Sequence, residues 1–283
     1  MTARAVKRGG PAPMSAADEL DPTSSVLAFF ASELRRVRLE AGVPQKELAR
    51  RAYITPSLLC KIESACRVPS QDLAEQFDQV LGSDGHFTRL WPLVIKHAYP
   101  SWFRPFVELE AQATIIRSFE NQVVPGLLQT ESYARAVLEA GPLDTVEELV
   151  AARLERQRIL RREAPPELWV VLDENVLRRS VGGPAVMREQ LGRLMEAAES
   201  RRNVIQVVPY SAGAHAGLGP FWVFSFTEGA DVLYTDGLFQ GQLSADPGEV
   251  RTALRAYDLL RAVALSPRAS IDLIATVMKD LNP

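Results

Sequence analysis

Through residues 25–82, apolar residues recur at intervals of three and four, which is the period of one face of an amphipathic α-helix. Gly42 ends the first predicted helix, and Pro44 and Pro56 stand where the first turns of the next two helices would begin. Thr55 directly precedes Pro56 and is a good N-cap residue. This pattern predicts a compact all-α bundle of four or five short helices.

The pattern changes after about residue 100. Runs of β-branched and aromatic residues, bounded by Pro, Gly, Asp and Asn, alternate there with segments of helical period. We therefore expect an α+β domain over residues 102–283, with a small sheet flanked by helices, joined to the bundle by a connector at 83–101. Residues 1–24 lack a hydrophobic period and are predicted to be a disordered arm. Strands are predicted at 168–172, 204–208, 221–226 and 232–234, and helices at 102–112, 130–140, 144–163, 184–200, 247–263 and 267–280.

Composition narrows the possible classes of function. The net charge of −3, with 47% hydrophobic and 24% charged residues, is typical of a globular protein and unlike a polybasic tail. No apolar run is long enough for a membrane span, and the N-terminus has no secretory signal, so we expect a cytoplasmic, nucleoid-associated protein. Two Cys and three scattered His offer neither a disulfide framework nor zinc-ligand spacing. We expect no metal and no cofactor.

The segment 44–63, PQKELARRAYITPSLLCKIE, has the layout of a helix-turn-helix. Ala49 is small, so two helices can cross closely, and Thr55 would cap a second helix whose early residues face base edges in the major groove. The surrounding residues 26–68 carry eight Lys and Arg against four Glu, a local basic excess that favours DNA. The expected base-facing residues are Pro56, Ser57 and Lys61, and the expected phosphate-facing residues are Gln45, Lys46, Thr55, Arg35, Arg50, Arg51 and Arg67.

This segment resembles the Cro/C1-type (XRE) helix-turn-helix family, in which Gln opens the second helix and a Ser or Thr caps a recognition helix that ends in Ile-Glu. Two departures stand out. Tyr53 occupies the turn position where Gly is usual, so the backbone there either avoids positive φ or is strained. Pro56 and Leu58 replace polar residues at the front of the recognition helix, which leaves fewer donors for bases. The matching residues are Gln45, Ala49, Thr55, Ser57, Ile62 and Glu63.

The rest of the chain, including VPGLLQTESYARAVL at 124–138 and VVLDENVLRRSVGG at 170–183, resembles the C-terminal domain of actinobacterial XRE-type regulators that are WhiJ-like and antitoxin-like. The resemblance implies a sequence-specific DNA-binding transcriptional regulator of developmental or antibiotic-related genes. It also implies a small protein partner encoded nearby. It carries over no catalytic residues, so we expect no enzymatic activity. Because one such domain reads only a few base pairs, a homodimer on double-stranded DNA is expected.

Two alternatives remain open. An antitoxin-like scaffold would mainly bind a small partner protein, with DNA binding secondary. A small-molecule sensor or hydrolase would use the loop at 211–219, SAGAHAGLG, around His215. No nucleophile elbow, metal-ligand spacing or phosphate loop accompanies His215, so a structural loop or a contact with a ligand or partner is favoured over catalysis.

Two charged segments of the second domain have simpler interpretations. Adjacent Asp173 and Glu174 are expected to cap the next helix rather than to form an acid–base pair. An arginine-rich run on the long predicted helix is interpreted as a solvated face laced with salt bridges, with a protein interface or a phosphate contact as alternatives. This run contains Arg153, Arg156, Arg158, Arg161 and Arg162.

Overall fold

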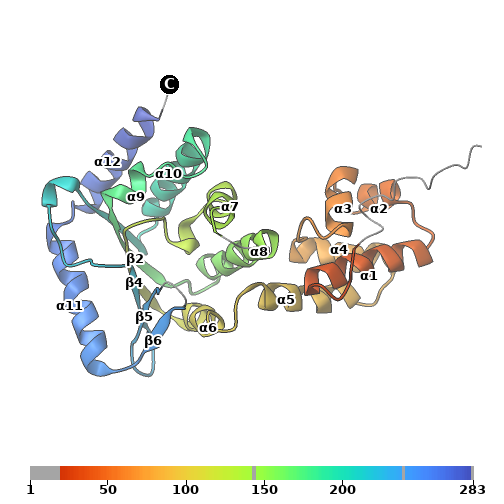
Figure 1. The fold of residues 1–283 in the computed structure, drawn as a ribbon, viewed down its shortest axis with the longest axis horizontal. Coiled ribbons are helices and arrows are strands. Elements are labelled where there is room, and N and C mark those ends of the chain that lie inside the picture. Colours follow the sequence, from red (N-terminus) through yellow and green to blue (C-terminus); the bar gives the residue numbers. More distant parts are fainter. Residues whose placement is uncertain (1–19, 142–144, 238–239, 282–283) are drawn as a thin grey trace, which may run out of the picture. The chain divides into compact units, whose positions relative to one another are not determined.

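The computed structural model describes residues 20–141, 145–237 and 240–281, so most of the predicted N-terminal arm lies outside the described residues. The chain divides into two compact units, residues 1–94 and 95–283. These are the N-terminal unit and the C-terminal unit below, and Figure 1 shows their elements.

The N-terminal unit is entirely helical in its described part. Three helices begin with a side-chain cap, in which the hydroxyl of Ser25, Thr55 or Ser70 accepts a hydrogen bond from the backbone N–H three residues later. Phe30, Leu34, Leu48, Leu59 and Phe77 are fully buried and form the core. The predicted bundle of short helices is confirmed. Its helices are α1 (Val26–Glu40), α2 (Gln45–Arg51), α3 (Pro56–Glu63) and α4 (Gln71–Leu81). Helix α5 (His86–Ala98) begins in this unit, ends four residues beyond Val94, and lies within the predicted connector.

The C-terminal unit is built on a mixed six-stranded sheet with the order β3-β2-β1-β4-β5-β6. The first three strands are parallel, and β4, β5 and β6 are antiparallel to their neighbours. Four strands were predicted from the sequence and are confirmed, whereas the central strand β1 and the edge strand β6 were missed. The bounds are β1 (Ile115–Glu120), β2 (Glu167–Asp173), β3 (Asn203–Val208), β4 (Phe221–Ser225), β5 (Val232–Thr235) and β6 (Gln242–Ser244).

Helices cover both faces of the sheet, which confirms the predicted α+β class (Figure 1). Helix α11 (Pro247–Val263) packs Val250, Tyr257 and Leu260 on one face, and the Tyr257 hydroxyl donates to the carbonyl oxygen of Trp169 at 2.8 Å. The other helices supply residues to the opposite face or pack beside it. These are α6 (Arg104–Gln112), α7 (Glu131–Glu139), α8 (Val146–Arg156), α9 (Glu174–Arg178), α10 (Pro184–Glu199) and α12 (Pro267–Asp280). The unit also contains the 3₁₀ turns η2 (Gly126–Leu128), η3 (Gln157–Arg161) and η4 (Tyr210–Ala212).

The interpretation of the arginine-rich helix as a solvated face is wrong for two of its residues. The α-helix ends at Arg156 and continues as a 3₁₀ turn. Arg156 points into the unit and forms a bidentate ion pair with Glu110, with both N–O distances at 2.6 Å. Arg153 on the same side donates to Gln129 at 2.9 Å. The partner of Arg156, Glu110, lies 46 residues away in the sequence, so the local pattern around Arg156 could not indicate that its charge is paired inside the unit.

Candidate nucleic-acid interface

Helices α2 and α3 form a helix-turn-helix. Ala49 on α2 and Leu59 and Ile62 on α3 have no exposed surface, so the two helices pack closely at the small residue, as predicted. The Thr55 hydroxyl accepts a hydrogen bond from the backbone N–H of Leu58 at 3.2 Å and fixes the start of α3.

The residues predicted to face DNA bases are placed on one exposed part of α3. Pro56, Ser57 and Lys61 are all solvent-exposed. A helix that is packed on Leu59 and Ile62 and exposed at its first turn can be presented to a groove of DNA. Whether these side chains contact bases stays a prediction.

A buried polar network holds the C-terminal end of α3. The Arg38 guanidinium on α1 donates to both carboxylate oxygens of Glu63, at 2.5 and 3.0 Å, and to the Val43 carbonyl at 3.1 Å. The Gln45 amide nitrogen at the start of α2 also donates to Glu63, at 3.0 Å. This network ties three helices together, so Gln45 positions α3 here, and its contact with phosphate stays a prediction.

The other residues predicted to face phosphates are divided between exposed and half-buried positions. Lys46, Arg50, Arg51 and Thr55 are exposed, and Arg35 and Arg67 are half-buried. On α2, Glu47 accepts hydrogen bonds from Arg50 at 2.7 and 2.9 Å and from Arg51 at 2.6 Å. These bonds lower the pKa of the Glu47 carboxyl to about 2, so it is charged at neutral pH. Exposed ion pairs of this kind stabilise little, and phosphates could replace the carboxylate at small cost.

Tyr53 is strained in the turn between the two helices. Its φ is +55°, in the left-handed region, and its side chain is 91% exposed, so no packing offsets the steric cost of the backbone.

Replacing Tyr53 with Gly should therefore raise the free energy of unfolding by about 1 kcal/mol. Urea unfolding of the full chain measures the change. Tyr53→Ala, which removes the ring but keeps a Cβ, is the control and should change stability by less than about 0.5 kcal/mol. A glycine variant no more stable than the original chain would contradict the strain argument, and a destabilised alanine variant would show that the ring packs against the unit.

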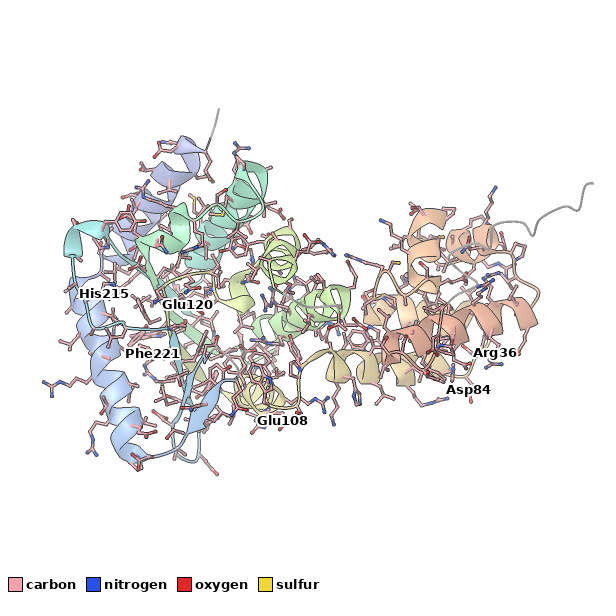
Figure 2. The ribbon with its side chains drawn as sticks, in the orientation of Figure 1. Arg36, Asp84, Glu108, Glu120, His215 and Phe221 are labelled. Carbon is pink, nitrogen blue, oxygen red and sulfur yellow. The ribbon has the colours of Figure 1, made fainter. Side chains whose placement is uncertain are left out.

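His215, labelled in Figure 2, makes one hydrogen bond within its own loop and one with Asp173 at the end of β2. Its Nδ1 accepts a hydrogen bond from the backbone N–H of Gly217 at 3.2 Å. The hydrogen-bond pattern therefore assigns the proton to Nε2, which donates to Asp173 at 3.0 Å. Asp173 also accepts from the Asn175 backbone N–H at 2.8 Å and caps α9, as predicted. Because both ring nitrogens already have hydrogen-bond partners, one within the loop and one at the end of β2, this geometry favours the structural interpretation over a catalytic base.

Gly217 is required by the close approach of this loop to the sheet. A Cβ at this position would lie 2.2 Å from the Phe119 ring, and Phe119 is fully buried. We expect Gly217→Ala to lower the free energy of unfolding by about 1–3 kcal/mol, because the core must shift to admit the methyl group. Gly219→Ala in the same loop is the control, since a Cβ there meets no atom within 4 Å. Thermal unfolding of both variants measures the difference, and equal midpoints would contradict the packing argument.

The comparisons with known proteins agree with these two units. Residues 30–91 match a family described as a helix-turn-helix domain, which confirms the predicted motif and is characteristic of DNA-binding regulators. Residues 103–276, more than half of the chain, match a family described as a domain of unknown function (DUF5753). The chain belongs to this family. Neither the curated proteins nor the solved structures gave a match. Within the described residues, the helices are too short or too polar to cross a membrane.

Proposed function

We propose that this protein is a sequence-specific DNA-binding transcriptional regulator of the Cro/C1 type. The observation that carries the proposal is the exposure of Ser57 and Lys61, one turn apart on α3. The Arg38–Glu63 ion pair fixes the C-terminal end of this helix. The helix would enter the major groove, where Lys61 can donate to guanine and Ser57 can contact several bases.

Residues of α2 and its neighbours supply the sequence-independent part of the binding. Lys46, Arg50 and Arg51 lie exposed on one short helix and would contact phosphates. Two copies on a near-palindromic site, separated by about one helical turn (~34 Å), would double the contacts. The homodimer is part of this proposal because one domain of this size reads only a few base pairs. The family resemblance supports the other parts: a small protein partner, WhiJ-like regulation of developmental or antibiotic-related genes, and the lack of an enzymatic activity.

The proposal is tested by selecting a duplex from a random pool with the full chain and measuring binding by fluorescence anisotropy. Lys61→Ala should weaken binding to the selected duplex by about 1–3 kcal/mol and relax the choice of sequence. Replacing Arg50 and Arg51 with Ala should weaken all duplexes alike and reduce the log–log salt slope by ~0.9 for each lost phosphate contact.

Lys279→Ala is the matched control, because it removes the same charge from an exposed position on α12. It should leave both affinity and specificity unchanged. The proposal fails if no duplex binds at low salt, or if the Lys61 and Arg50/Arg51 variants lose affinity equally on every sequence. A stable complex with a small protein that binds no duplex would support the scaffold alternative.

A further inference from the structure

The C-terminal unit contains a cavity of about 270 Å³. It lies between strands β1, β2, β4 and β5 and the segments α6, η2 and α8. A volume of this size is close to the lower limit of small-molecule sites. It is separate from the His215 loop, because none of the residues 211–219 lines it.

The side of the cavity formed by β1 contains polar residues, whereas residues on the inward side of a sheet are normally apolar. Ile116, Ser118 and Glu120 alternate along β1 and all line the cavity, and both polar residues are buried. Strand β1 lies at the centre of the sheet, so polar residues on its inward side cost stability unless they serve a function. Glu120 ends β1 inside the unit (Figure 2).

The position in the sheet also favours a ligand. Strand β1 is parallel to β2 on one side and antiparallel to β4 on the other, and the strand order reverses at β1. In open parallel sheets, ligands bind beside the carboxyl ends of strands where the strand order reverses, and at β1 this rule applies to the parallel side formed by β1, β2 and β3. Glu120 is the last residue of β1, and the following residues 123–129 form one side of the cavity.

The charged groups of the cavity are not all paired with one another. Glu110 and Arg156 satisfy each other in their ion pair. The Arg153 Nε atom is buried and has no hydrogen-bond partner in the part of the chain that the structure describes. Burial, together with the negative charge of Asp236, raises the pKa of the Glu120 carboxyl well above its usual value. Besides this ion pair, the carboxyl groups of Glu120 and Asp236 and the guanidinium of Arg153 line the cavity. The cavity therefore has one more acidic group than basic groups.

Aromatic rings form another wall. The ring centroid of Phe106 lies 4.5 Å from that of Tyr234 and 5.7 Å from that of Trp222, and the Tyr234 hydroxyl donates to Asp236 at 2.5 Å. Aromatic faces bind apolar groups and attract cations. A carboxyl excess beside an aromatic wall is the chemistry that recognises an organic amine.

We propose that this cavity binds a small organic cation: a protonated amine with an apolar ring and a hydrogen-bond acceptor. The ammonium group contacts the Glu120 carboxylate, the ring packs against Phe106 and Trp222, and the Arg153 Nε–H donates to the acceptor oxygen. A positive charge beside Glu120 restores the charged form of the carboxyl, which burial alone disfavours. The site is independent of the DNA-binding proposal, because its chemistry lies wholly within the C-terminal unit.

The probe is tyramine, which carries a protonated amine, a ring and a phenol oxygen, and its binding to the full chain is measured by isothermal titration calorimetry. Three relatives each remove or change one feature: phenethylamine lacks the phenol oxygen, 4-ethylphenol lacks the amine, and 4-hydroxyphenylacetate carries a carboxylate instead. Tyramine should bind most tightly, phenethylamine and 4-ethylphenol more weakly, and the carboxylate not at all. A Kd for tyramine above about 1 mM, or equal or tighter binding of the carboxylate, overturns the proposal.

Two variants locate the bound amine. Glu120→Gln keeps the shape of the neutral carboxyl and should weaken tyramine at least about tenfold, because a charge-assisted contact is lost. Asp236→Asn, at an exposed position of the same cavity, should also weaken it and keeps the test valid should the buried substitution impair folding. Glu228→Gln removes an exposed carboxylate outside the cavity and is the control. Unchanged tyramine binding in folded Glu120→Gln or in Asp236→Asn contradicts the assignment.

Discussion

Replacing Glu63 with Ala should destabilise the N-terminal unit by about 3–5 kcal/mol, because it leaves the Arg38 guanidinium buried without its counter-charge. The side chains of this pair are only 9% and 6% exposed, so water cannot take the place of the carboxylate. Gln45 would lose its acceptor as well. Urea unfolding of the full chain, with hydrogen exchange to assign the loss to the N-terminal unit, measures the effect.

Two controls separate charge burial from general damage at this position. The double variant Arg38→Met with Glu63→Leu removes both charges and should recover most of the lost stability, because a buried pair of this kind offers little over apolar packing. Glu40→Ala breaks an exposed ion pair with Arg36 on the same helix and should cost less than about 1 kcal/mol. A Glu63→Ala loss no larger than that of Glu40→Ala would show that Arg38 finds water or another acceptor.

Replacing Arg156 with Ala should destabilise the C-terminal unit by a similar ~3–5 kcal/mol, because Glu110 is then left buried and unpaired. The guanidinium also lies over the rings of Phe106 and Phe103, at 5.1 and 5.3 Å from the ring centroids, so the substitution removes cation–π contacts and leaves a void. Thermal unfolding of the full chain measures the loss.

Arg156→Lys tests the geometry of this pair. Lysine keeps the charge but cannot form the bidentate pair or stack its head group on the rings, so it should recover only part of the stability. Arg158→Ala, on the adjacent 3₁₀ turn, breaks a partly exposed pair with Glu155 and should cost less than about 1 kcal/mol. Full recovery with lysine would mean that charge alone matters at this position.

Local signals in the sequence predicted much of the N-terminal unit. Thr55 and Pro56 mark the start of α3, and the small Ala49 marks the crossing of α2 and α3; each depends on neighbouring residues alone. Tyr53 shows where local information ended: the sequence allowed either strain or an avoided positive φ, and the structure has the strained backbone. The fold of the C-terminal unit was predicted less completely. The polar residues Ser118 and Glu120 interrupt the apolar alternation of β1, so the central strand of the sheet was not recognised from the sequence.

The amino-acid sequence by itself determined the helix-turn-helix and four of the six strands, because caps, turn residues and hydrophobic period act over a few residues. Only the tertiary structure decided which charges are buried. Arg38 forms its ion pair with Glu63, which is 25 residues away in the sequence, and Arg156 forms its ion pair with Glu110, which is 46 residues away. A charged residue on a helix has the same local pattern whether water or a distant carboxylate satisfies it, so the folded chain alone distinguishes a solvated arginine from a buried one.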